Sequence, residues 1–243
     1  MRVWTFSKRC AKEILRDPIN LFFGLGFPIV LLLLLSAIQA NVPVDLFVIE
    51  RLTPGIAVFG LSFLTLFSAS LIAKDRESAF LQRLYTTPLR AHEFILGYML
   101  PMLPLAIAQS ACCYLVANML GLPFTVNIFY AVLFQLPMSV FYISLGLLFG
   151  SILNSKQVGG VCGALLTNLS AWLSGVWFDL SLVGGVFERV ARALPFVHAV
   201  ELGRKALDGN FSEISARLGF VFLYMLVASF GAVLLFLRQM KKQ

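Results

Sequence analysis

The stretch that decides the fold, residues 94–155, reads FILGYMLPMLPLAIAQSACCYLVANMLGLPFTVNIFYAVLFQLPMSVFYISLGLLFGSILNS. Its 62 residues contain no Asp, Glu, Lys, Arg or His. A membrane span needs about 20 apolar residues to cross about 30 Å of hydrocarbon, so this stretch is long enough for two. The sequence Gly121-Leu122-Pro123 predicts the turn between them, because Gly and Pro interrupt helices.

Four further windows without charged residues are each one span long, at 19–44, 52–73, 157–178 and 218–237. The whole chain is 59% hydrophobic and only 13% charged, where soluble domains are nearer one-quarter charged. We therefore expect an all-α membrane protein with six transmembrane helices. Their expected ranges are 19–39, 52–73, 94–120, 128–150, 157–177 and 216–237.

The distribution of Lys and Arg predicts the orientation. With six spans, residues 1–18, 74–93, 151–156 and the tail after 237 share one face, and they hold 13 of the 19 Lys and Arg residues. The positive-inside rule then places both termini in the cytoplasm. The net charge of +7 reflects this bias and attraction to anionic headgroups in the lipid bilayer, and no nucleic acid is expected as a partner.

Two segments outside the spans are expected to be amphipathic. In residues 1–18, Trp4 and Ile14 recur at helical spacing opposite Lys8, Arg9 and Lys12, which predicts a helix lying in the membrane interface. A soluble helix beside the membrane is the alternative. Residues 179–215 mix charges with apolar patches on both sides of a proline, which predicts a re-entrant segment of two short helices before the last span.

The sequence lacks the residue patterns of an enzyme. It has no Gly-rich phosphate-binding loop with a lysine, no paired carboxylates and no cluster of Cys and His with metal-ligand spacing. The spans contain no Asp, Glu, His or Lys that could take up and release a proton. We expect no catalytic residues, no metal and no cofactor bound by this chain, so its energy would come from another subunit.

One loop offers a candidate contact with such a subunit. Residues 73–89 read AKDRESAFLQRLYTTPL, in which Phe80, Leu81, Leu84 and Tyr85 form a short apolar helical face. Thr87-Pro88 ends it, because the residue before proline avoids helical geometry. Such a helix fits a groove on a partner. A helix lying on the lipid headgroups explains the same pattern equally well.

The same loop resembles a known family. The Leu84-Tyr-Thr-Thr-Pro-Leu89 element and the partial match Asp75-Arg-Glu-Ser resemble the membrane subunit of ABC-2-type transporters, bacterial exporters with a type V-like fold. Further matches extend the resemblance over nearly the whole chain. They are Asp17 to Phe22 before span one, Leu52-Thr-Pro-Gly55 before span two, and Leu194-Pro-Phe, Arg204 and Gly209 before span six.

The resemblance implies one transmembrane domain, 1–243, that pairs with a second permease subunit, identical or homologous, in the bacterial cytoplasmic membrane. Two copies of a separate ATP-binding subunit would carry ATP and Mg and dock on the cytoplasmic loop 75–88. The residues implied in this coupling are Asp75, Arg76, Glu77, Phe80, Leu81, Arg83, Leu84, Tyr85, Thr87 and Pro88.

The resemblance also implies a substrate path along spans two and five. Phe59, Phe63 and Phe67 recur every four residues and so share one side of span two. They and Asn168 and Trp172 in span five are the candidate path residues. Packing against a neighbouring helix or lipid is the other explanation of the aromatic stripe.

The expected function is that of a permease subunit in an ATP-driven exporter of an amphipathic compound, such as a drug, a natural product or a lipid-like molecule. Export of a lipid-linked polysaccharide is a closely related alternative. A carrier independent of ATP, a membrane scaffold and an intramembrane enzyme are the alternatives from other classes.

Overall fold

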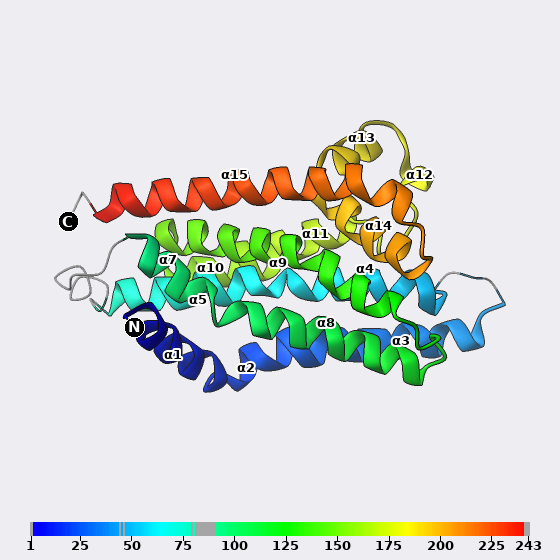
Figure 1. Ribbon diagram of the computed structural model, residues 1–243, viewed down its shortest axis with the longest axis horizontal. Helices are drawn as coiled ribbons and strands as arrows, with labels where there is room; N and C mark the ends of the chain where they lie inside the picture. The colour runs from blue at the N-terminus through cyan, green and yellow to red at the C-terminus, as the bar shows by residue number, and fades with distance from the viewer. Residues whose placement is uncertain (1, 44, 46, 79, 81–90, 241–243) are drawn as a thin grey trace.

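The fold comes from a computed structural model, which describes residues 2–43, 45, 47–78, 80 and 91–240. Every regular element in these residues is a helix, and most lie along one axis (Figure 1). In chain order they are α1 (Arg2–Leu15), α2 (Pro18–Leu21), the π-helix η1 (Phe22–Gly26), α3 (Phe27–Asn41), α4 (Ile49–Leu61), α5 (Phe63–Glu77), α7 (Ala91–Met99), α8 (Met102–Met119), α9 (Asn127–Ile152), α10 (Ser155–Val158), the π-helix η2 (Gly159–Leu166), α11 (Thr167–Leu173), α12 (Leu180–Val183), α13 (Gly185–Ala193), α14 (Pro195–Leu207), the 3₁₀ helix η3 (Phe211–Glu213) and α15 (Ile214–Met240).

Five helical stretches in the described residues are long and apolar enough to cross a membrane. They are Pro18–Asn41, Ile49–Glu77, His92–Met119, Asn127–Ile152 and Phe211–Arg238. The all-helical fold class is therefore confirmed, whereas the count of six spans is not.

The expected span 157–177 is the one missing from these five. Residues 155–173 are helical throughout, but as α10, η2 and α11 in succession. At 1.5 Å per residue this stretch is only about 28 Å long. It also carries Lys156, Gln157 and Asn168, which make it less apolar than the other five.

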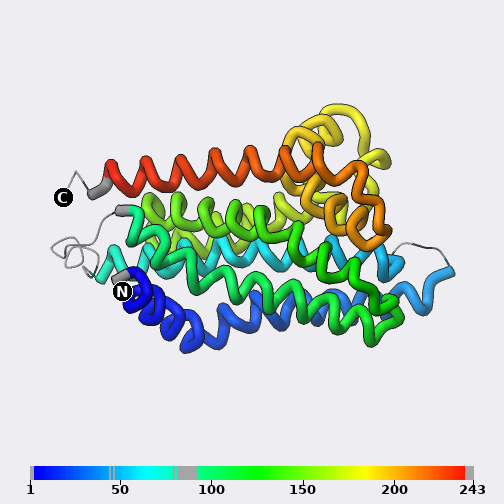
Figure 2. Tube along the Cα trace, in the orientation of Figure 1, coloured from blue at the N-terminus to red at the C-terminus, as the bar shows by residue number. Residues whose placement is uncertain are grey.

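The stretch Ile49–Glu77 is the centre of the bundle. In its most apolar part 89% of the residues are buried, against 22% in the stretches Pro18–Asn41 and Phe211–Arg238. Of the other long helices, α3, α8 and α9 contact it directly, and α15 packs against α9 (Figure 2). We call the end that carries α1 and the last turn of α15 the inner end, and the opposite end, with α12 to α14, the outer end (Figure 1).

The connections at the outer end follow the sequence. The predicted turn is confirmed: α8 ends at Met119, α9 begins at Asn127, and Gly121 takes a φ of +109°, which a glycine adopts without steric cost. In the segment 179–215, α13 ends at Ala193, Leu194 is extended, and α14 begins at Pro195. The α14 side chains Val200 and Leu202 are fully buried, so α14 belongs to the core of the bundle.

Glycines on α9 let the backbones of α5 and α9 come into direct contact. A Cβ atom at Gly150 would lie 2.5 Å from the Ala69 carbonyl oxygen, and one at Gly146 would lie 2.5 Å from that of Thr65. The close approach also allows hydrogen bonds between the helices. The Thr65 hydroxyl donates to the Tyr142 carbonyl at 2.9 Å.

This contact predicts the effect of Gly150→Ala. The added methyl group would meet backbone atoms that cannot rotate away, so we expect a loss of about 1–3 kcal/mol of stability, as for other overpacked cores. Thermal unfolding in mild detergent measures it. Gly159→Ala is the matched control, because nothing lies within 4 Å of a Cβ there. Equal melting temperatures for the two variants would contradict the contact.

Candidate functional site: a polar clasp at the inner end

The last turn of α5 holds a buried carboxylate. Asp75 is only 3% exposed, although the sequence placed it in a loop after the span. Its two oxygens accept hydrogen bonds from Arg9 Nη1 and Nη2 of α1, each at 2.5 Å. The Tyr98 hydroxyl of α7 donates to the same carboxylate at 2.8 Å. A two-pronged guanidinium contact of this kind fixes orientation as well as charge.

Arg9 connects further groups to this carboxylate. It donates to Glu13 at 2.5 Å, and its guanidinium lies 4.3 Å from the centre of the Phe80 ring, a cation–π distance. Burial alone would lower the pKa of Arg9, but the hydrogen bond and charge of Asp75 raise it above its ordinary value. The guanidinium therefore stays charged at every physiological pH.

The two residues that follow Asp75 hold two other helices. Arg76 donates to the carbonyl of Ser151 and, at 2.5 Å, to that of Leu153, at the C-terminal end of α9. Glu77 accepts from the Ser155 backbone N–H at 2.8 Å and from its hydroxyl at 2.7 Å, at the start of α10. A cation at a helix C-terminus and an anion at an N-terminus both satisfy unpaired backbone groups and the helix dipole.

Three consecutive residues of α5 thus contact neighbours on three different sides of the helix. Successive residues of an α-helix point about 100° apart, so Asp75, Arg76 and Glu77 necessarily face different neighbours. We call these three residues with Arg9 and Tyr98 the inner clasp. It ties the inner ends of α1, α7, α9 and α10 to α5.

Apolar packing supports the inner clasp from α1. Phe6 packs edge-on against Tyr98 with ring centres 4.9 Å apart, and Cys10 and Ile14 are buried on the same side. Burial raises the pKa of Cys10 to about 12, so it packs as a neutral thiol. Trp4, which the sequence placed on the apolar face, and Leu15 are 62% and 69% exposed. The helix therefore has two apolar sides, one on the protein and one exposed.

A cleft lies beside the inner clasp, between α1, α2 and α5. It has a volume of about 320 Å³ and combines charged side chains, among them Arg16 and Lys74, with apolar ones such as Phe67 and Leu71. Lys74 lies 3.3 Å from Asp17, which also caps the start of α2 through the Asn20 N–H. The cleft lies at the inner end of the bundle, among basic side chains of the chain.

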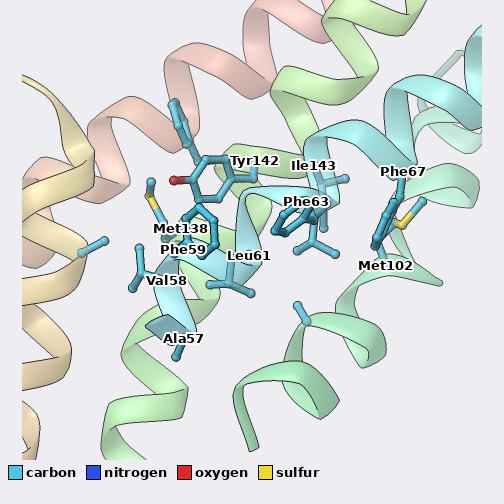
Figure 3. Packing of buried hydrophobic residues seen from close by; sticks show 14 of the residues in the cluster. Ala57, Val58, Phe59, Leu61, Phe63, Phe67, Met102, Met138, Tyr142 and Ile143 are labelled. Carbon is cyan, nitrogen blue, oxygen red and sulfur yellow. The ribbon is translucent and has the colours of Figure 1, made fainter. Parts of the chain in front are cut away.

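The candidate path residues fall into two groups. Phe59, Phe63 and Phe67 are at most 7% exposed and lie in line along the central helix (Figure 3). Phe63 packs against Phe27 of α3 with ring centres 5.8 Å apart. Asn168 and Trp172 of α11 are exposed, Trp172 by 52%, and Asn168 donates only to the Ala164 carbonyl.

The coupling residues are only partly described. Asp75, Arg76, Glu77 and Phe80 lie in or next to the inner clasp. Leu81, Arg83, Leu84, Tyr85, Thr87 and Pro88 lie outside the described residues. In the part of the chain that the structure describes, no group of three or more His, Cys, Asp and Glu side chains comes together as metal ligands would.

Sequence reasoning missed Arg9 and Tyr98. A signal existed for Tyr98, because a phenol inside a long apolar span needs a hydrogen-bond partner. Arg9 gave no such signal, since it belongs to a run of basic residues on the polar side of α1. Its pairing with Asp75 spans 66 positions in the sequence.

Several long apolar helices packed with one buried central helix are the architecture of an integral membrane protein. Charged residues connect these helices at their inner ends. The sequence profile of the ABC-2 type transporter family matches residues 1–207, and the chain belongs to this family. It is therefore the permease subunit of an ABC transporter, without an ATPase site of its own, in a family normally paired with an ATP-binding subunit. A search of curated proteins gives no match.

The inner clasp predicts a large effect of Asp75→Asn. The change removes the charge that compensates Arg9 and weakens the contact of α1. We expect a loss of about 2–3 kcal/mol, below the range for fully buried pairs because Arg9 is 30% exposed. Unfolding in detergent measures the loss, and limited proteolysis should release α1 first.

Lys74→Gln is the control for this variant. Lys74 forms an ion pair with Asp17 at the same end, but its side chain is 62% exposed, so its loss should change stability by at most about 1 kcal/mol. If both variants unfold alike, the inner clasp does not hold the helix ends together.

Proposed function

We propose that the chain is the membrane half of an ATP-driven exporter that moves an amphipathic compound out across the bacterial cytoplasmic membrane, with both termini in the cytoplasm. A drug, a natural product or a lipid-like molecule fits this class, and multidrug efflux is one form of it. Family membership supports the permease role. The outward direction and the amphipathic substrate are our proposals.

The inner clasp is the observation that carries the coupling mechanism. The last turn of α5 leads directly into residues 81–90, where we place the docked ATP-binding subunit. A displacement of this segment would pull on Asp75, Arg76 and Glu77, and through them on α1, α7, α9 and α10. Because hydrogen-bonded charge pairs have preferred geometries, the displacement would move the partner helices and would not be taken up by side-chain rearrangement.

This arrangement divides the coupling residues into two roles. Asp75, Arg76 and Glu77 already have partners within the chain, so we assign them to transmission. Docking then falls to Phe80 and to Leu81, Arg83, Leu84 and Tyr85, with Thr87 and Pro88 ending the contact. Two ATP-binding subunits, which carry the ATP and Mg, would serve two permease subunits in a homodimer or heterodimer.

For the substrate path we propose the line of Phe59, Phe63 and Phe67. Phe67 lines the inner cleft, and Phe59 packs at 5.7 Å against Trp177 at the outer end. An apolar molecule moving along this line would have to displace the rings of α3 and η1 that cover it. Asn168 and Trp172, exposed on α11, would join the path only from a facing second subunit.

Replacing Leu84 and Tyr85 together with Asp tests docking. Two carboxylates on the apolar face cannot enter a hydrophobic groove without losing their hydration. We expect the complex with the co-purified ATP-binding subunit to lose most of its substrate-stimulated ATP hydrolysis, by about tenfold or more. Insertion and yield should be unchanged. Gln82→Asp, on the polar side of the helix that the sequence predicts, is the control and should keep the stimulation.

Transmission is tested by reversing the charges of the inner clasp. Asp75→Asn should leave the ATP-binding subunit bound in a pull-down with the tagged chain, yet lower the amount transported per ATP hydrolysed. The double variant Arg9→Asp with Asp75→Arg should recover part of this loss, because the pair can form again. If the two residues act only through their separate effects on folding, the double variant will transport no more per ATP hydrolysed than Asp75→Asn does.

Reconstitution decides between the classes. Liposomes containing the chain and the ATP-binding subunit should transport only with ATP and Mg. Uptake by the purified chain alone, driven by an ion gradient, would replace our proposal with an ATP-independent carrier.

A further inference from the structure

A second pocket lies at the outer end, at the start of α4 and beside α12 and α14. Its volume is about 380 Å³, and we call it the outer pocket. Arg51, Arg204, Trp177, Phe178 and Asp179 are among the residues that line it. None of these residues takes part in the inner clasp or in the proposed docking of the ATP-binding subunit.

Arg204 is held in place but not neutralised. Its Nε donates to the Arg51 carbonyl at 3.1 Å, and its Nη2 donates to the Gly175 carbonyl at 3.2 Å. Gly175 presents this carbonyl from a turn with a φ of +69°, a conformation natural to glycine. Backbone carbonyls orient a guanidinium without cancelling its charge. Among the described residues, no hydrogen bond from its Nη1 group is present, so this group can face a ligand.

Neither Arg51 nor Arg204 forms an ion pair with the residues that the structure describes. Burial lowers the pKa of Arg204, and the charge of Arg51 lowers it further, while Asp179 acts in the opposite direction. Arg51 is exposed and Arg204 is half-buried, so water screens part of the repulsion between them. A bound anion would relieve this repulsion.

The other charges of the outer pocket are compensated or lie in water. Glu201 pairs with Arg217, and Arg192 pairs with Glu188 at 2.8 Å. Asp179 is exposed and accepts hydrogen bonds from the backbone N–H and hydroxyl of Ser181, which lower its pKa. Asp45 is also exposed. Because water screens exposed charges far more than buried ones, the attraction of Arg204 for an anion outweighs the repulsion from these carboxylates.

The wall beside the arginines is apolar and aromatic. Trp177 and Phe178 both line the outer pocket, with Leu52 and Val176. Trp177 is fixed edge-on against Phe59 of the central helix with ring centres 5.7 Å apart. A site with guanidinium groups on one side and aromatic rings on another suits a molecule that has an anionic head and a hydrocarbon body.

We propose that the outer pocket binds the anionic head, phosphate or carboxylate, of an amphipathic molecule between Arg51 and Arg204, with its apolar part against Trp177 and Phe178. The proposal does not depend on ATP coupling or on the direction of transport. It concerns binding by this chain alone.

Fluorescence of Trp177 tests the proposal in the full chain. The chain has three tryptophans, so Trp4→Phe and Trp172→Phe leave Trp177 as the only reporter. In nanodiscs of phosphatidylcholine the protein is titrated with dodecyl phosphate, dodecyltrimethylammonium and inorganic phosphate. We expect saturable quenching by dodecyl phosphate, and weaker binding of inorganic phosphate, which lacks the apolar part.

Arg51→Gln should weaken dodecyl phosphate binding by about tenfold or more, the effect of losing one charge-assisted hydrogen bond. This variant keeps the backbone carbonyl that orients Arg204, so the pocket should remain formed. Arg189→Gln on α13 is the control, because Arg189 bonds only to the Gly185 carbonyl of its own helix and should leave binding unchanged. Arg204→Gln should weaken binding at least as much as Arg51→Gln.

Three results would overturn the proposal. Equally tight quenching by the cationic dodecyltrimethylammonium would show that charge is not recognised. Equal affinity for inorganic phosphate would show that the apolar wall is not used. An unchanged affinity in Arg51→Gln would show that the arginines do not hold the head.

Discussion

The structure depends on one buried charge, the carboxylate of Asp75 at the inner end of the most buried helix. A carboxylate removed from water is costly unless a partner of opposite charge and further hydrogen bonds compensate it. Arg9 and Tyr98 supply both, and they come from helices separated from α5 in the sequence. This polar contact and the packing of Phe6 against Tyr98 together fix α1 and α7 on the inner end of α5.

The charged groups at the outer end of the central helix are arranged differently from those at its inner end. At the outer end Arg51 of α4 and Arg204 of α14 have no carboxylate partner among the described residues. At the inner end Lys74 and Asp75 form ion pairs, and Arg76 and Glu77 form hydrogen bonds to neighbouring helix ends. Phe59, Phe63 and Phe67 occupy the apolar length between. We therefore assign a structural role to the inner end and ligand binding to the outer end.

Hydropathy and charge predicted much of this fold. The absence of charge in residues 94–155 correctly indicated two helices and the turn at Gly121. Hydropathy could not distinguish lipid-facing from core-facing side chains, because both are apolar, so the aromatic stripe of α4 and α5 remained open to two explanations. The pairing of Arg9 with Asp75 was also invisible, since helical periodicity describes one helix at a time. The span 157–177 is not confirmed by the structure, because Gln157 and Asn168 make this helical stretch less apolar than the other five and absence of charge alone does not define a span.

The contact of Gly146 and Gly150 with α5 has a mechanical consequence. Side chains between two helices act as a compliant layer, since rotamers can change when the helices shift. Where glycine removes this layer, the two backbones meet directly and hydrogen bonds such as that from Thr65 link them. The α5–α9 pair should therefore respond to force as one stiff rod. Strain applied at either end would be conducted along its length.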